Sequence, residues 1–272
     1  NIMATAFSEN LTAEQQSQVL QVFQQFQHPS LQKDLIALNT LKKVEKGGDV
    51  LRVELQLPFA WNTGVEQVKQ QLSDALLKAT DSKEIKWVVN YQIATLKRAN
   101  NQPAVKGVKN IIAVTSGKGG VGKSSVSVNL ALALQAQGAR VGILDADIYG
   151  PSVPHMLGAP HQRPTSPDNQ HITPIKAHGL SANSIGFLMD EDNATIWRGP
   201  MASSALSQLL NETLWDSLDY LVIDMPPGTG DIQLTLSQQI PVTGAVVVTT
   251  PQDIALLDAV KGVSMFERVS VP

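Results

Sequence analysis

Residues 111–124 read Ile-Ile-Ala-Val-Thr-Ser-Gly-Lys-Gly-Gly-Val-Gly-Lys-Ser, and this stretch decides the fold of the larger part of the chain. An apolar, strand-like run leads into the pattern G-x-x-x-x-G-K-[ST]. Residues 125–137 then have the composition of a helix, which Gly138 ends. This strand–loop–helix context distinguishes a phosphate-binding loop from an ordinary glycine-rich turn. Glycines let backbone N–H groups surround a phosphate, and the helix N-terminus adds partial positive charge.

The residues expected to contact nucleotide phosphates are consecutive. They are Gly117, Lys118, Gly119, Gly120, Val121, Gly122, Lys123 and Ser124. In such a loop Lys123 is expected to bridge the β- and γ-phosphates, and the Ser124 hydroxyl to ligate Mg²⁺. Lys118 is an additional lysine that a simple phosphate loop does not require, so it has either a function of its own or the role of a solvated loop charge.

Short apolar runs alternate with helical stretches throughout the second part of the chain. The runs cover residues 111–114, 141–144, 180–185, 220–223 and 245–249. Unbroken apolar strands between helices indicate a parallel sheet that is covered on both faces. We therefore predict an α/β fold with a mainly parallel sheet flanked by helices.

Carboxylates follow two of these predicted strands. Asp145 and Asp147 come directly after residues 141–144, and Asp224 comes directly after residues 220–223. Open α/β sheets bind ligands at the carboxyl ends of their strands, so Asp224 is expected beside the metal. We interpret Asp145 as an indirect contributor to the metal site, although a helix cap or turn former is an alternative for both Asp145 and Asp147. Asp231, further along, reads as the cap of the helix that follows it.

The first part of the chain has a different pattern. Thr12 and Gln15 predict a capping box at the start of a helix over residues 12–27. A Lys-Gly-Gly-Asp turn at 46–49, a helical stretch at 64–79 and a strand at 85–91 follow. We predict a small α+β domain over residues 1–98, a linker over 99–107, and the nucleotide-binding domain over 108–272.

Composition excludes several classes of function. The 272 residues carry a net charge of −3 without a basic tract, so charge favours binding neither to nucleic acid nor to an anionic membrane. There is no cysteine, which excludes disulfides and thiolate ligation of a metal by this chain. No apolar run approaches the length of a membrane span, and the N-terminus has no signal pattern, so we expect a cytoplasmic protein.

The loop with its second lysine resembles the deviant Walker A ATPases, a group that includes MinD, ParA and the nitrogenase iron protein. The resemblance implies that Lys118 reaches the nucleotide of the partner in a homodimer, as an arginine finger does. It also implies that Asp147 orients the attacking water beside the metal, and that the Gly228 N–H approaches the γ-phosphate. The loop at Pro251 would lie near the base, although the start of a helix is an equal reading there.

Longer strings resemble the Mrp/ApbC family of iron–sulfur cluster carriers. They are Leu-Asp-Ala-Asp-Ile-Tyr-Gly-Pro-Ser-Val-Pro at 144–154, Trp-Arg-Gly-Pro-Met at 197–201, Asp-Met-Pro-Pro-Gly-Thr-Gly-Asp at 224–231 and Thr-Thr-Pro-Gln-Asp at 249–253. The resemblance implies a slow, dimer-dependent ATP hydrolase that uses ATP and Mg²⁺ and transfers clusters to apoproteins. Cluster-assembly scaffold proteins would be further partners. Residues 12–98 are similar to the MIP18-type domain that precedes the ATPase in bacterial Mrp proteins.

One departure from that family concerns the cluster ligands. The family binds its bridging cluster through a Cys-x-x-Cys pair in each subunit, whereas this chain has no cysteine and stops at Pro272. We therefore expect a C-terminally truncated chain, with a [4Fe-4S] cluster only in the complete protein. Two alternatives are a positioning ATPase of the MinD or ParA kind and a nucleotide-dependent assembly scaffold.

Overall fold

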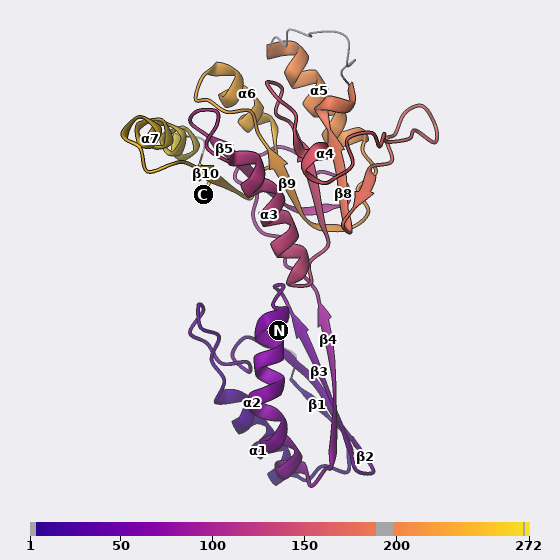
Figure 1. Ribbon diagram of the computed structural model, residues 1–272. Helices are drawn as coiled ribbons and strands as arrows, with labels where there is room; N and C mark the ends of the chain where they lie inside the picture. Colours follow the sequence, from indigo (N-terminus) through magenta and orange to yellow (C-terminus); the bar gives the residue numbers. More distant parts are fainter. Residues whose placement is uncertain (1–3, 189–198, 269) are drawn as a thin grey trace. The chain divides into compact units, whose positions relative to one another are not determined.

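The computed structural model describes residues 4–188, 199–268 and 270–272. The chain divides into two compact units, Asn1–Ala94 and Thr95–Pro272 (Figure 1). Each unit has a hydrophobic core of its own, and none of the described residues belongs to both cores. The units are therefore described one at a time.

The first unit is a four-stranded sheet with two helices. Its strands lie in the order β1 (Ala6–Phe7), β2 (Leu41–Gly47), β3 (Val50–Leu57) and β4 (Glu84–Tyr91). Strands β2 and β3 form an antiparallel hairpin, whereas β1 and β4 pair in parallel with their neighbours. The helices α1 (Ala13–Gln24) and α2 (Asn62–Thr80) share a core with the alternate buried side chains of β3.

Local sequence signals explain the boundaries in this unit. The backbone N–H of Gln15 donates to the Thr12 hydroxyl at 3.1 Å, and that of Thr12 donates to the Gln15 side chain at 2.9 Å, which confirms the capping box. Residues 35–39 form a turn before β2. There the Asp34 carboxylate accepts the backbone N–H of Ile36 and that of Ala37.

The second unit is a six-stranded sheet in the order β10-β5-β9-β6-β8-β7. All neighbours pair in parallel except β7 and β8, so the predicted mainly parallel sheet is confirmed. The strands are β5 (Val108–Ser116), β6 (Val141–Asp145), β7 (Ile175–Ala177), β8 (Leu180–Ser184), β9 (Leu218–Asp224) and β10 (Gly244–Val248). The helices are α3 (Lys123–Ala136), α4 (Val153–Met156), α5 (Gly199–Glu212), α6 (Asp231–Gln239) and α7 (Asp253–Arg268), with a 3₁₀ turn η1 (Ile185–Leu188).

The register of the sheet brings the predicted site residues together at the carboxyl ends of neighbouring strands. Asp224 at the end of β9 lies opposite Asp145 on one side and Val114 on the other. Val248 at the end of β10 lies opposite Ser116 at the end of β5. The loops that leave these four strands therefore start side by side.

Residues 99–107, expected to form a linker, lie against the second unit. The backbone N–H of Ala99 donates to the carbonyl of Val242 at 2.8 Å, and the Asn100 side chain donates to the carbonyl of Ile240 at 2.8 Å. Val105 belongs to the second core. Within the described residues, no helix combines the length and the apolarity that crossing a bilayer requires.

Candidate nucleotide-binding site

Lys123 is the centre of a buried network at the carboxyl ends of β9 and β6. Its ammonium lies 2.7 Å from one carboxylate oxygen of Asp224 and 3.3 Å from an oxygen of Asp147. The Lys123 side chain is 6% exposed and that of Asp224 is fully buried. A buried carboxylate is costly unless it is paired and hydrogen-bonded, so this lysine and this aspartate hold each other in place.

Two serines of α3 complete the hydrogen bonding of Asp224. The Ser124 hydroxyl donates to one Asp224 oxygen at 2.6 Å, and the Ser127 hydroxyl donates to the other at 2.7 Å. Ser124 is the last residue of the phosphate-loop pattern, whereas Ser127 lies one helical turn further along and was not predicted. The spacing of four residues from Lys123 puts Ser127 on the same face of α3, and this is the only signal that could have indicated it.

The loop itself has the backbone that its glycines predict. Gly120 and Gly122 have φ values of 76° and 89°, a left-handed region that favours glycine. A Cβ atom added at Gly119, Gly120 or Gly122 would meet no atom within 4 Å. These three positions therefore border open space, as a cradle for phosphate requires. Val121 and Lys118 in the same loop are partly exposed.

Gly117 is needed for a different reason. A Cβ atom there would lie 2.4 Å from the backbone carbonyl of Asp258 in α7. Real Cβ atoms do not approach backbone atoms so closely, so the first glycine of the motif allows α7 to pack against the phosphate loop.

Asp145 organises the loop that carries Asp147. Its carboxylate accepts the backbone N–H of Asp147 at 3.1 Å, that of Val153 at 3.0 Å, and the Ser184 hydroxyl at 3.3 Å. Burial and, to a smaller extent, the nearby charge of Asp224 together raise the pKa of Asp145 to about 7, although the two N–H groups oppose the shift. By accepting these hydrogen bonds, Asp145 holds the loop that carries Asp147 in place.

Asp147 faces the network directly. Burial raises the pKa of Asp147 above its ordinary value, and the adjacent Lys123 partly offsets the effect. One of its carboxylate oxygens accepts the backbone N–H of Tyr149 at 3.1 Å, and the other faces Lys123. This carboxylate is thus oriented by its own loop.

The donor set at Ser124, Asp147 and Asp224 suits Mg²⁺, which prefers oxygen ligands and is usually bound by one or two carboxylates together with substrate phosphates. The described residues contain no group of three or more acidic, histidine or cysteine side chains that could hold a metal alone. The residues therefore fit a metal that binds with the nucleotide and do not form a separate metal centre.

The N–H of Gly228 was expected to approach the γ-phosphate, but in the structure it already has a hydrogen-bond partner. This N–H donates to the carbonyl of Ser116 at 2.8 Å, so this group is already engaged with the end of β5. The φ of Gly228 is 119° and no atom lies within 4 Å of a Cβ built there. Contact between this N–H and a γ-phosphate requires the bond to Ser116 to break first.

The remaining predicted residues lie outside the buried network around Lys123. Among the described residues, none accepts a hydrogen bond from the Lys118 ammonium or pairs with it, and its backbone carbonyl accepts the Ser116 hydroxyl at 2.7 Å. Pro251 is exposed in the loop between β10 and α7.

Asp231 is the first residue of α6, whose cap is Gly230, so the prediction that Asp231 caps this helix is wrong. Arg198, in one of the quoted strings, lies outside the described residues.

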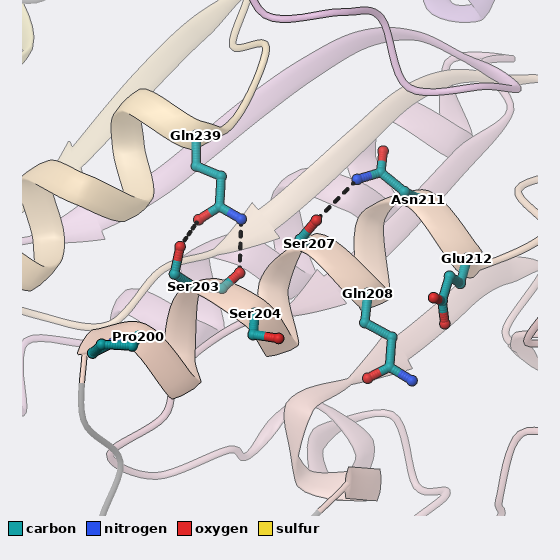
Figure 2. A pocket seen from close by; sticks show the side chains of 8 residues that line it. All are labelled: Pro200, Ser203, Ser204, Ser207, Gln208, Asn211, Glu212 and Gln239. Carbon is teal, nitrogen blue, oxygen red and sulfur yellow. Dashed lines mark hydrogen bonds between the residues drawn. The ribbon is translucent and has the colours of Figure 1, made fainter.

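A separate pocket of about 650 Å³ lies along α5 and the end of α6 (Figure 2). Its hydroxyl and amide groups bond mainly to each other, as Ser203 does with Gln239 at 2.7 Å. It includes no phosphate-loop residue and only one ionisable side chain, Glu212. We therefore place the candidate site at the carboxyl ends of the strands and not in this pocket.

Comparisons with known proteins identify relatives of this chain. The family model described as ParA, NUBPL iron-transfer P-loop NTPase, matches residues 107–272. The chain is 90% identical over 270 residues to the iron-sulfur cluster carrier protein of Haemophilus influenzae, covering 99% of this chain and 73% of that protein. It is 66% identical over 247 residues to the protein of the same name from Escherichia coli, covering 91% of this chain and 67% of that one.

Among solved structures, a nucleotide-binding protein from Archaeoglobus fulgidus in complex with ADP matches with a TM-score of 0.53 and 38% identity. The match covers 61% of this chain and 65% of that one.

Proposed function

The chain belongs to the NUBPL iron-transfer P-loop NTPases, and from this membership we propose that it is an ATP-hydrolysing carrier of iron–sulfur clusters. Residues 117–124 bind ATP in this proposal, and the ATPase cycle drives the loading or delivery of the cluster. The observation that carries the proposal is the buried network joining Lys123, Ser124 and Asp224 at the carboxyl ends of the central strands.

Each residue of the network has a role that its position suggests. Lys123 places a positive charge beside the loop backbone, where it can move from Asp224 to the β- and γ-phosphate oxygens. Ser124, Asp224 and Asp147 would hold Mg²⁺, which neutralises phosphate charge when it is bound. Asp147 would orient the attacking water and accept its proton, a task for which a raised pKa is suited. Pro251 would lie near the nucleotide base.

The trans role of Lys118 fits its surroundings. Among the described residues none pairs with its ammonium, so none of them holds it away from a partner subunit. In a homodimer the same lysine can add positive charge at the γ-phosphate of the facing site, where charge develops during phosphoryl transfer. Turnover is then slow and depends on dimer formation.

The cluster is the cargo of this proposed cycle. The sequence contains no cysteine, so the residues present do not fit thiolate ligation of a cluster. This chain therefore contributes the nucleotide-dependent part of the carrier function. Apoproteins that receive clusters and scaffold proteins that assemble them are its proposed partners.

Mixing two inactive variants tests the nucleotide site. Lys123→Ala removes the cation between the phosphates and should abolish ATP binding, whereas Lys118→Ala should keep ATP binding and lower turnover by about a hundredfold. In a mixed dimer, the intact loop of the Lys118→Ala subunit receives Lys118 from the Lys123→Ala subunit. Phosphate release should therefore recover in the mixture.

The control is Lys106→Ala, which removes an exposed lysine of the same unit and should leave binding and turnover unchanged. Thermal unfolding is measured for each variant because Lys123→Ala also leaves two buried carboxylates without their cation. A mixture no more active than its components would contradict the trans role of Lys118. Loss of ATP binding in both variants would contradict it as well.

Cluster transfer is tested in the Haemophilus influenzae relative. That protein, with or without the change equivalent to Lys123→Ala, is reconstituted anaerobically with iron and sulfide and mixed with an apo-acceptor. We expect ATP to change the rate of transfer by the unaltered protein only. Transfer at equal rates with and without ATP would separate the ATPase from the carrier function.

A further inference from the structure

Gln233 connects three elements beneath the site without belonging to the predicted motifs. It lies on α6 and is 3% exposed. Its amide nitrogen donates to the Thr115 hydroxyl on β5 at 2.7 Å, and that hydroxyl has a longer contact of 3.4 Å with the carbonyl of Pro226. The side chain thus joins α6 to the strand before the phosphate loop and to the loop after Asp224.

The amide oxygen of Gln233 has no hydrogen-bond partner among the described residues, although it is buried. Buried polar atoms are nearly always paired, and an exception calls for an explanation. The opposite end of the same amide is well bonded, so the side chain is fixed in place while its oxygen remains available as an acceptor.

A pocket of about 290 Å³ adjoins Gln233. It is lined by Tyr149, two residues after Asp147, and by Pro226, Pro227, Gly228 and Gly230 of the loop after β9. This loop is the segment that must move if the N–H of Gly228 is to leave Ser116. The pocket gives the loop space for a second position next to the unpaired oxygen.

We propose that Gln233 is a positioning residue whose amide oxygen accepts a backbone N–H of residues 228–230 when ATP draws this loop toward the γ-phosphate. The bond to Thr115 holds the amide at the correct place in both positions of the loop. Gln233 thereby stabilises the loop conformation in which Gly228 contacts the nucleotide. This inference rests on the proposed ATPase function.

Hydrogen exchange and kinetics of Gln233→Met test the inference, because methionine has the length of glutamine without its amide. In the unaltered chain, a non-hydrolysable ATP analogue should slow the exchange of the amides at 228–230 at least tenfold relative to ADP. Gln233→Met should remove this difference and lower kcat about tenfold. Its Kd for ADP should stay within about threefold of the original value, because ADP has no γ-phosphate for the loop to contact.

Two further variants separate positioning from general stability. Gln238→Leu alters an exposed glutamine of the same helix and should behave like the unaltered chain. Thr115→Val removes the hydroxyl that anchors Gln233 and preserves the shape of the residue, so it should reproduce part of the effect. The double variant Thr115→Val, Gln233→Met should be no worse than Gln233→Met alone, because both changes disrupt one unit.

The inference is overturned if Gln233→Met retains the ATP-specific protection and the original kcat. It is also overturned if the variant weakens ADP and the ATP analogue equally and lowers Tm, since that pattern indicates a purely structural role. If the unaltered chain binds ADP and the analogue but releases no phosphate, the proposed ATPase fails. Protection at 228–230 still decides the role of Gln233 in that case.

Discussion

Asp145 is fully buried next to two other carboxylates, and only Lys123 supplies a positive charge among the contacts described for them. Burial and, to a smaller extent, the charge of Asp224 raise its pKa to about 7, compared with about 3.9 for an aspartate in an unfolded chain. The folded protein therefore holds a proton that the unfolded chain releases in this pH range. A raised pKa contributes stability that is fully present below the unfolded pKa and is lost as pH rises through the folded pKa.

We predict that the free energy of unfolding, measured by urea in Mg²⁺-free buffer, falls between about pH 5.5 and pH 8 by more in the unaltered chain than in Asp145→Asn. The difference should be on the order of 2 kcal/mol, because one pKa unit corresponds to about 1.4 kcal/mol. Asparagine does not titrate but retains one oxygen to accept a backbone N–H. The two proteins differ only at this residue, so parallel pH profiles would show that Asp145 is ionised throughout.

Single residues differed in how well the sequence predicted them. Lys123 and Ser124 could be identified from the fixed spacing of strand, loop and helix, and Asp224 from its place at the end of an apolar run. Their roles toward nucleotide and metal remain predictions. Ser127 and Gln233 could not be identified in this way, because neither belongs to a motif of defined spacing and their partners lie far away in the chain. Only the sheet order shows that these pairs meet.

At the scale of elements, the phosphate loop depends on two kinds of glycine. Gly117 permits close packing of α7, whereas Gly119 borders open space. We predict that Gly117→Ala lowers Tm by several degrees, because the added methyl group would force α7 away from the loop. Gly119→Ala should leave Tm within about a degree, because its methyl group meets no atom of the protein.

The affinity for ADP should distinguish Gly119→Ala from Gly117→Ala as well. The methyl group of Gly119→Ala would occupy space over the loop that phosphate needs, so ADP affinity measured by calorimetry should fall at least tenfold. Both variants are compared with Gly150→Ala, where an added Cβ also meets nothing and the residue lies outside the phosphate loop. Unchanged ADP binding by Gly119→Ala would argue against phosphate binding at this loop.

Helices and strands with a strong hydrophobic pattern were predicted from the sequence, and those with a weak hydrophobic pattern were missed. The five predicted runs all overlap strands of the sheet, and β6 and β9 among them are buried along nearly their whole length, as the apolar runs within them predict. The edge strands β1 and β7 have only two and three residues, too few to establish an alternation. Helix α5 was missed although Ala202, Leu206 and Leu209 follow a helical spacing, since serines interrupt the apolar pattern.

At the scale of the whole molecule, the two cores share none of the described residues, and the candidate nucleotide site is built from residues of the second unit. The boundary at Ala94 came earlier than expected because residues 95–107 bond to the second unit, which their polar composition did not reveal. The predicted likeness of the first unit to the MIP18-type fold stays a prediction.

Separate cores predict separate unfolding transitions, and a ligand stabilises only the unit that binds it. At a concentration of ADP and Mg²⁺ about a hundredfold above Kd, binding adds about 2.7 kcal/mol to the stability of the second unit. For a unit of this size that should raise its Tm by roughly 5–10 °C, while the Tm of the first unit stays constant. Differential scanning calorimetry of the whole chain measures both.

The transitions are assigned with Val53→Ala, which creates a cavity in the first core and should lower one Tm only. The transition that this variant lowers should be the one that ADP leaves unchanged. If ADP instead raised both transitions together, the two units would unfold as one cooperative block. The first unit would then take part in the response to nucleotide, and its role in a carrier cycle would have to include that coupling.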